Sequence, residues 1–240
     1  MLKLFIDPGH GGRDPGAVGR GANSDLRESD IVLDVSLRLQ ELLRGHIDTK
    51  LSRESDIFLT INERWQMSNV WGADFFLSIH ANAGGGTGAE TLYFRQDAHA
   101  FATSIQDSYS QKMQLRNRRV WFRDDIGVVR HTSCPSILLE LAFIDAPDTA
   151  PDLQILRNQR QEMAETIAEA IFFHLQIKPL SPSSPAEGRF MALSEIPDWG
   201  RPTIAKLIEK GALKGDGSGL NLSEDMLRLL VINDRMGLYS

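Results

Sequence analysis

Short apolar runs alternate with longer amphipathic segments over most of the chain. An apolar run closed by turn-forming residues predicts a buried strand, and apolar residues that recur every three or four positions predict a helix. Strands are expected at 2–6, 46–51, 74–80, 91–95 and 137–141, and helices at 28–44, 60–71, 98–115 and 158–176. This alternation predicts an α/β fold, with a mostly parallel twisted sheet and helices on both of its faces.

The pattern changes after the last long helix. Residues 178–190 are rich in proline and serine and carry few hydrophobic side chains, which is typical of a linker. Two short helical patterns follow this linker. We therefore expect three parts, namely a domain at 1–177, the linker, and a small helical module at 191–240 that alone can form only a marginal core.

Composition narrows the functional classes. The 240 residues carry a net charge of −6, whereas nucleic-acid binders usually have a basic surplus, so we expect no nucleic-acid partner. No apolar run approaches the roughly 18 residues that cross a bilayer, so we expect no membrane insertion. Cys134 is the single cysteine, which excludes a disulfide within the chain.

The first six residues run straight into the first predicted strand. They lack the basic segment, the long apolar segment and the small-residue cleavage site of a Sec signal peptide. We expect either synthesis in the cytoplasm without a signal, with release through membrane holes or by cell lysis, or a signal that has already been removed.

Ionisable residues fall at the ends of the predicted strands. His10 follows the first strand, His80 ends the third, and Glu140 interrupts the last. Ligand sites in open parallel sheets form outside the carboxyl ends of the strands, so these side chains are expected to share one edge. Glu28 opens the helix after a glycine-rich loop and can return to the same edge.

Two histidines and one glutamate with an open fourth position are typical of catalytic zinc sites. A further carboxylate must take a proton from the attacking water and pass it to the leaving group. Glu140 is the candidate, because a lone glutamate among isoleucine and leucine is costly to bury unless it is paired or used. The spacing alone is weak evidence, since the chain lacks the His-Glu-x-x-His helix of common zinc proteases.

Several longer stretches strengthen this interpretation. They are FIDPGHGGRDPGAVG at 5–19, RESDIVLDVSLRLQELL at 27–43, LSRESDIFLTINERWQMSN at 51–69, ADFFLSIHANA at 73–83, GAETLYF at 88–94 and CPSILLELAFID at 134–145. In this order they resemble the zinc-dependent N-acetylmuramoyl-L-alanine amidases, the Amidase_3 family, which occurs among bacterial autolysins and phage endolysins. The resemblance extends from residue 1 to about residue 177.

The resemblance implies a site and a substrate. It implies His10, Glu28 and His80 as zinc ligands and Glu140 as the catalytic base. It also implies peptidoglycan as the partner, cut at the amide bond between N-acetylmuramic acid and L-alanine. The family usually has glycine where this chain has Ala142, and the extra methyl group would narrow the cleft while leaving the chemistry intact.

Several polar residues keep two interpretations. Asn82 is either a substrate contact or a cap of its loop, and Glu90 either faces the cleft or only starts a strand. Asp7 forms a turn or supports a metal ligand. Cys134 and His131 suggest a thiol nucleophile, but Cys134 precedes a proline and a strand, so a small buried residue is favoured.

Alternative functions remain beside the zinc amidase. One is a catalytically inactive peptidoglycan-binding protein of the same fold, which the four matched residues argue against. Another is a different metal hydrolase such as a carbohydrate deacetylase, whose usual Asp-rich metal set is not found. The module at 191–240 loosely resembles one S-layer-homology repeat, which would bind a secondary wall polymer, or it packs on the first domain or dimerises.

Overall fold

The computed structural model describes residues 1–177, 189–215, 219–235, 237 and 239. The chain divides into two compact units, Met1–Lys178 and Pro179–Ser240. Most of the expected linker lies outside the described residues. Its last residue, Phe190, belongs with the second unit, because the backbones of Phe190 and Leu222 exchange two hydrogen bonds.

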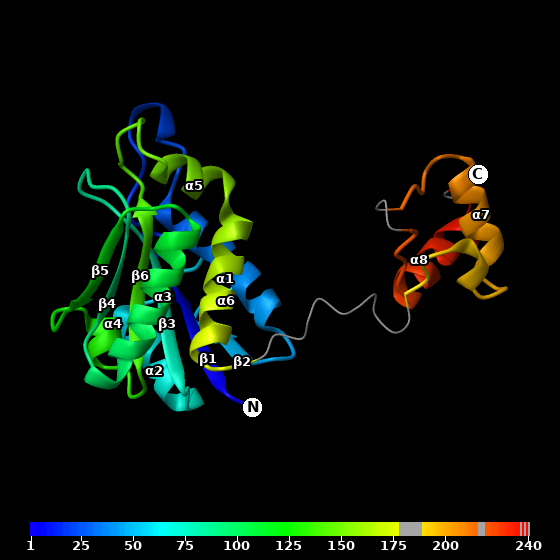
Figure 1. Cartoon of the computed structure of the whole chain (residues 1–240). Helices are drawn as coiled ribbons and strands as arrows, with labels where there is room; N and C mark the ends of the chain where they lie inside the picture. Colours follow the sequence, from blue (N-terminus) through cyan, green and yellow to red (C-terminus); the bar gives the residue numbers. More distant parts are fainter. Residues whose placement is uncertain (178–188, 216–218, 236, 238, 240) are drawn as a thin grey trace. The chain divides into compact units, whose positions relative to one another are not determined.

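A six-stranded sheet forms the centre of the first unit. Its strands are β1 (Lys3–Pro8), β2 (Asp48–Leu51), β3 (Phe75–Asn82), β4 (Ala89–Tyr93), β5 (Asn117–Phe122) and β6 (Ser136–Phe143). They lie in the order β2-β1-β3-β6-β4-β5, and all neighbours are parallel except β4 and β6 (Figure 1). The prediction of a mostly parallel sheet is confirmed.

Helices cover both faces of this sheet. They are α1 (Glu28–Leu43), α2 (Ile61–Trp71), α3 (His99–Lys112), α4 (Gly127–Arg130), α5 (Asp152–Asn158) and α6 (Arg160–His174), with 3₁₀ turns η1 (Gly21–Asn23) and η2 (Gln96–Ala98). The larger apolar core joins one face to α1, α3 and α6. On the other face Phe5, Phe76 and Leu138 pack with residues of α2 and α4. The prediction of helices on both faces is therefore confirmed.

Three elements are not predicted by the sequence pattern. β5 is an edge strand with the sequence NRRVWF, in which only the last three residues are apolar, too few to predict a buried strand. α4 and α5 are shorter than the window in which a helical repeat can be recognised. β5 is placed by its pairing with β4, and α4 and α5 are placed by their contacts with β6.

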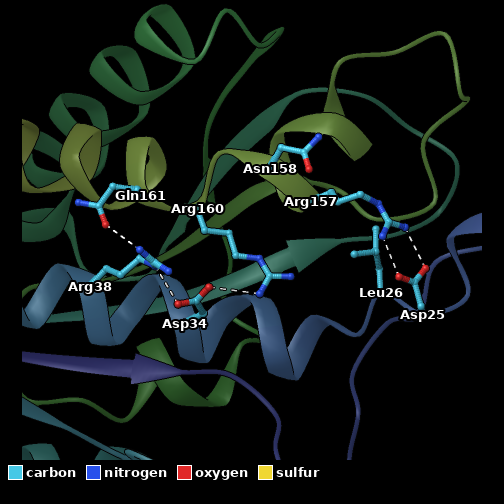
Figure 2. Close-up of a pocket in the computed structure, with 8 residues that line it drawn as sticks. All are labelled: Asp25, Leu26, Asp34, Arg38, Arg157, Asn158, Arg160 and Gln161. Atoms are coloured by element: carbon cyan, nitrogen blue, oxygen red, sulfur yellow. Dashed lines mark hydrogen bonds and ion pairs between the residues drawn. The ribbon is translucent and has the colours of Figure 1, made fainter. Parts of the chain in front are cut away.

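Ion pairs fasten α1 to the helices that follow β6 (Figure 2). Asp34 of α1 accepts a hydrogen bond from Arg160 over 3.2 Å. Asp25, just before α1, accepts two from Arg157, over 2.7 and 2.8 Å. These side chains line a surface depression of about 490 Å³. Because Glu28 is the first residue of α1, these contacts help to fix a residue that the sequence singles out.

The second unit is a small helical module. It contains η3 (Leu193–Glu195), α7 (Arg201–Glu209) and α8 (Glu224–Arg235), and apolar residues of both helices share one core. Thr203 and Lys206 of α7 each donate to Asp234 of α8 over 2.8 Å, which ties the helices together. Among the described residues, no helix is both long and apolar enough to cross a membrane.

Candidate metal centre and active-site cleft

Two histidines and a glutamate meet at the carboxyl edge of the sheet. His10 follows β1, His80 lies near the end of β3, and Glu28 begins α1. β1 and β3 are parallel neighbours, with Pro8 opposite Ile79, so both histidines are delivered to the same edge. The structure thus brings together three side chains that lie far apart in the sequence.

The three side chains form a compact donor set. One ligand atom from each residue lies within 4.8 Å of the other two. Oε1 of Glu28 is 3.1 Å from Nε2 of His10 and 2.9 Å from Nδ1 of His80. The two imidazole rings meet edge to face, with centroids 4.9 Å apart. Two imidazole nitrogens and a carboxylate oxygen fit a catalytic zinc ion, which keeps a further position for water or substrate.

Hydrogen bonds from outside the cluster orient these side chains. Nδ1 of His10 is bonded to the carboxylate of Asp14 over 2.9 Å, which leaves Nε2 facing Glu28. Glu28 accepts from the backbone N–H groups of Ala17, over 2.8 Å, and Ala81, over 3.0 Å. Outer partners of this kind fix the orientation and the tautomer of a metal ligand.

Two glycines leave the space that the cluster occupies. A Cβ atom at Gly9 would lie 2.3 Å from Cε1 of His80. A Cβ atom at Gly16 would lie 2.6 Å from Oε2 of Glu28 and 2.7 Å from Cδ2 of His10. Gly16 also has a φ of 66°, a conformation that strains other residues. The glycine-rich loop therefore closes around these three side chains in a way that larger residues would prevent.

Glu28 keeps its negative charge although it is buried. Burial by itself raises the pKa of Glu28, but the hydrogen bonds and charges of His10 and His80 hold that pKa well below its usual range. Burial lowers the pKa of His10, but Glu28 and Asp14 outweigh it and raise the pKa to about 9. A metal ion that binds here would therefore displace protons from the two histidines.

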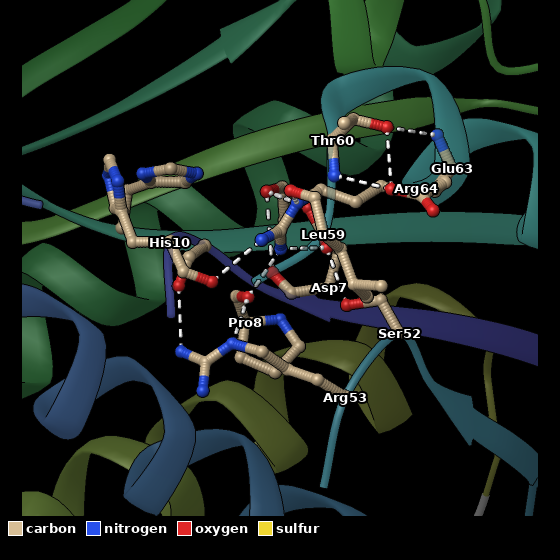
Figure 3. Close-up of polar contacts among 12 residues, drawn as sticks. Asp7, Pro8, His10, Ser52, Arg53, Leu59, Thr60, Glu63 and Arg64 are labelled. Carbon is tan, nitrogen blue, oxygen red and sulfur yellow. Dashed lines mark hydrogen bonds and ion pairs between the residues drawn. The ribbon is translucent and has the colours of Figure 1, made fainter. Parts of the chain in front are cut away.

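Two buried arginines hold the loop that carries His10 (Figure 3). Arg64 donates to the carbonyl oxygens of Pro8 and His10, each over 2.7 Å. Arg53 donates to the carbonyl oxygens of Pro8, over 3.0 Å, and Gly9, over 2.8 Å. His10 has a φ of 58°, which is unusual for a residue other than glycine. The guanidinium groups thus fix the backbone at the point where it takes this conformation.

Asp7 lies beneath this loop and pairs with Arg64. It is 1% exposed and accepts hydrogen bonds from Arg64, over 2.8 Å, from Ser52, over 2.6 Å, and from Ser78, over 2.8 Å. The ion pair and the hydroxyl donors compensate for burying both charges. Asp7 therefore reaches His10 only through Arg64 and the backbone, and not through the imidazole ring.

Glu140 lies opposite His80 in the parallel register of β3 and β6. Its Oε2 atom is buried and has no hydrogen-bond partner among the residues that the structure describes. Burial raises the pKa of Glu140 to about 7, although the charge of His80 opposes this shift. An unpartnered carboxylate with such a pKa, next to a possible metal site, is suited to proton transfer at neutral pH.

A cleft of about 730 Å³ opens onto these residues. His10, His80 and Glu140 line it together with Leu92 and Leu138 of the sheet. Other lining residues come from the segment around the start of α2 and from the segment around the start of α4. The residues there are Phe58, Leu59, Thr60, Ile61, Asn62, Asp125, Ile126, Gly127 and Val128.

Asn82 and Glu90 are bonded to each other. Nδ2 of Asn82 donates to Glu90 over 2.6 Å, and its Oδ1 accepts from the N–H of Ala83 over 2.8 Å. The other oxygen of Glu90 accepts from Arg118 over 2.9 Å. Asn82 and Glu90 are not among the described residues that line the cleft. A substrate contact by Asn82 therefore stays a prediction.

Cys134 is a half-buried free thiol. Burial raises the pKa of Cys134 to about 11. A thiol with this pKa is not ionised at neutral pH, whereas cysteine nucleophiles act as thiolates. The alternative of a cysteine hydrolase therefore loses its support.

The sequence pattern does not point to Asp14, Arg53 or Arg64. The weak signal for Asp14 is its position four residues after His10 in the glycine-rich loop. Arg64 belongs to a helix in which polar residues are mixed with apolar ones, so the pattern does not distinguish it from a surface arginine. The contacts of these residues show their importance only in three dimensions.

Comparison with curated proteins finds amidases and an endolysin among the relatives. The chain is 41% identical over 164 residues to the sporulation-specific N-acetylmuramoyl-L-alanine amidase of Bacillus subtilis (strain 168), covering 64% of the chain and 61% of that protein. It is 35% identical over 185 residues to the endolysin of Bacillus phage SPP1, covering 71% of the chain and 67% of that protein. The match thus spans about three fifths of the sporulation-specific relative.

Solved structures share the fold of the first unit. The catalytic domain of CwlV, an N-acetylmuramoyl-L-alanine amidase from Bacillus (Paenibacillus) polymyxa var. colistinus, superposes with a TM-score of 0.68 at 29% identity over 74% of this chain and 100% of that chain. The amidase AmiC2 of Nostoc punctiforme gives 0.67 at 32% identity over 73% and 97%. The family model Amidase_3, N-acetylmuramoyl-L-alanine amidase, matches residues 4–172. The chain therefore belongs to this family of N-acetylmuramoyl-L-alanine amidases.

Proposed function

We propose that the chain is a zinc-dependent hydrolase that cuts the amide bond between N-acetylmuramic acid and L-alanine in peptidoglycan. One observation carries the proposal. The ligand atoms of His10, Glu28 and His80 lie within 4.8 Å of one another, and the unpartnered carboxylate of Glu140 stands opposite His80. Family membership and the names of the relatives support the same reaction.

The residues of the site divide the work of hydrolysis. His10, Glu28 and His80 would hold the zinc ion, which when bound supplies a Lewis acid for the scissile carbonyl and the attacking water. Glu140 accepts a proton from that water as its oxygen bonds to the carbonyl carbon. Glu140 then donates the proton to the nitrogen of L-alanine as the C–N bond breaks. The products are a lactyl carboxylate on the sugar and a free amino terminus on the peptide.

The shape of the cleft suits this substrate. Leu92 and Leu138 offer an apolar surface beside the polar residues of the site. The lactyl group and the alanine residue each carry a methyl group next to the scissile amide, and both can contact such a surface. The side chains of His10, His80 and Glu140, which also line the cleft, then lie at the amide itself.

We further propose that the protein acts on the cell wall. One relative is an endolysin and another is a sporulation-specific N-acetylmuramoyl-L-alanine amidase, and both names agree with an enzyme that acts on peptidoglycan. Peptidoglycan is the proposed partner of the first unit. Binding of a secondary wall polymer by the second unit stays a prediction.

Purified sacculi provide the direct test. The full chain should bind close to one zinc ion and release lactyl-muramate ends and L-alanine amino termini. Glu140→Gln should keep the zinc and lose the activity, while His80→Ala should lose both. His46→Ala, which changes a histidine remote from the cleft, should keep both. New reducing sugar ends without new amino termini would exclude an amidase. Binding to sacculi without any turnover by the zinc-loaded wild type would favour the inactive peptidoglycan-binding alternative.

A further inference from the structure

The apolar row beside the cleft continues to the edge of the sheet. Leu138 of β6 stands opposite Leu92 of β4, and Leu92 stands opposite Trp121 of β5. Residues opposite each other on neighbouring strands share one face of a sheet, so the three side chains form a row. Leu138 and Leu92 line the cleft. Trp121 extends the row by one strand, to β5 at the sheet edge (Figure 1).

Trp121 is held in place although it is exposed. Its side chain is 52% exposed, and its indole N–H donates to the carbonyl oxygen of Arg118 over 2.9 Å. Arg118 is itself fixed, because it donates to Glu90 over 2.9 Å and its guanidinium group lies 4.9 Å from the ring centre of Phe143. A side chain that is ordered before binding loses little entropy when a ligand covers it. Trp121 is therefore a preformed aromatic surface.

A polar row on the same face links this surface to the proposed catalytic residue. His80 stands opposite Glu140, and Glu140 stands opposite Glu90 across the antiparallel pair. Glu90 forms the ion pair with Arg118, whose carbonyl oxygen anchors Trp121. The reaction site and the exposed indole ring thus belong to one continuous face of the sheet.

We propose that Trp121 binds a sugar ring of the glycan strand that carries the scissile amide. The proposal rests on the proposed function, since it takes the polymer held at Glu140 as its occupant. Trp121 lies two strands from Leu138, which is roughly 10 Å at the usual strand spacing. A polymer whose amide lies in the cleft covers that distance, whereas a small amide substrate does not. Pyranose rings present C–H groups that pack against the face of an indole, and the polar N–H of Trp121 is already satisfied.

Phe122 offers a matched control. It is the next residue, it is 58% exposed, and by strand alternation it starts from the opposite face, where its ring contacts Tyr93 and also the ring of Phe94 just beyond β4. Substituting either aromatic residue with alanine removes a similar area of exposed apolar surface. Only Trp121 lies on the face that bears the cleft, so a shared effect on folding and a specific effect on binding can be separated.

The probe is a preparation of glycan strands stripped of their stem peptides, titrated against the full chain. Trp121→Ala should weaken binding by about tenfold or more, as loss of an aromatic anchor does. Trp121→Phe should restore most of the affinity, and Phe122→Ala should bind like the wild type. Turnover of a soluble monomeric muramoyl-L-alanine peptide should be unchanged in Trp121→Ala, because that substrate does not reach β5.

Three results would overturn the inference. They are an equal loss in the Trp121 and Phe122 variants, slower turnover of the monomer by Trp121→Ala, and wild-type binding that requires the stem peptide. The last result would point to a peptide strand as the occupant of the edge. Trp121-dependent glycan binding by a wild type that releases no L-alanine termini would support this inference while rejecting the proposed function.

Discussion

Arg64 donates a hydrogen bond to the carbonyl oxygen of His10 over 2.7 Å, while the imidazole of the same histidine lies 3.1 Å from Glu28. Arg64 thus holds the backbone of His10, while the imidazole of His10 belongs to the cluster with Glu28 and His80. The left-handed conformation of His10 costs a residue with a side chain roughly 1–2 kcal/mol. We infer that Arg64 stabilises this conformation and thereby the position of Nε2.

Arg64→Lys tests this relationship. Lysine keeps the charge beside Asp7 but presents a single ammonium group, which cannot replace the planar fork that reaches both Pro8 and His10. We expect the zinc affinity to fall by about 10- to 100-fold, as for other partners behind a metal ligand. Competition with a chelator measures the affinity, and circular dichroism checks the fold.

Arg201→Lys is the control for that substitution. Arg201 forms an exposed ion pair with Asp198 in the second unit, so its replacement should leave zinc affinity unchanged. An Arg64→Lys protein with wild-type zinc affinity would show that the loop keeps its conformation without the guanidinium group.

Gly9→Ala should disrupt the cluster by direct contact. The new methyl group would lie 2.3 to 2.8 Å from three atoms of the His80 ring, and the ring would have to move. We expect loss of most bound zinc and of the activity, with a loss of stability of about 1–3 kcal/mol from overpacking. Metal analysis of the purified protein and thermal unfolding measure the two effects.

Gly45→Ala is the control that introduces backbone strain without a steric clash. Gly45 has a φ of 80°, and a Cβ atom there would meet nothing within 4 Å. Alanine should therefore lower the stability by roughly 1–2 kcal/mol through its backbone conformation and leave the zinc content unchanged. Equal zinc loss in the two variants would contradict the assignment of Gly9 as the space for His80.

Glu140 should make the stability of the zinc-free protein depend on pH. Burial raises the pKa of Glu140 from 4.5 to about 7, so between these values the folded chain keeps a proton that the unfolded chain has released. The free energy of unfolding therefore falls as the pH rises through this window, by up to about 3 kcal/mol. Below pH 4.5 this loss disappears, because the group is protonated in both states.

Glu140→Gln removes this titration. Urea unfolding of the zinc-free proteins measures the effect. The free energy of unfolding of the variant should rise relative to that of the wild type between pH 4.5 and about 7. Above pH 7 the difference between the two proteins should stay constant. Glu54→Gln changes an exposed glutamate and should follow the wild type at every pH. If the difference in unfolding free energy between the Glu140 variant and the wild type does not change with pH, the pKa of Glu140 is not raised by folding.

The sheet and the shared location of the two histidines can be predicted from the sequence for one physical reason. Apolar runs mark β1 and β3, and parallel strands end at a common edge, so His10 and His80 can be placed together before any contact is known. The position of Glu28 depends on the path of the glycine-rich loop. That path is fixed by Arg53 and Arg64, which lie more than forty residues further along the chain.

Buried charge explains why the supporting residues escape prediction. Arg64 is buried only because it pairs with Asp7 and with backbone carbonyl oxygens, and a sequence pattern counts such an arginine as a surface residue. Trp121 escapes for the opposite reason, since β5 gains its place at the sheet edge from pairing with β4 and not from an apolar run. Both cases depend on contacts between distant segments.

The two units should fold independently, because their apolar cores share no residues. The larger core draws its buried residues from positions 4–172, and the second core draws its own from positions 196–231. A protein that ends at residue 177 should therefore keep its melting temperature, its zinc and its turnover of a soluble monomeric substrate. Loss of the fold in that protein would show that the second unit is part of one cooperative structure. Sedimentation with intact cell walls then tests the second unit: weaker retention of the short protein would support wall binding, and equal retention would support packing or dimerisation.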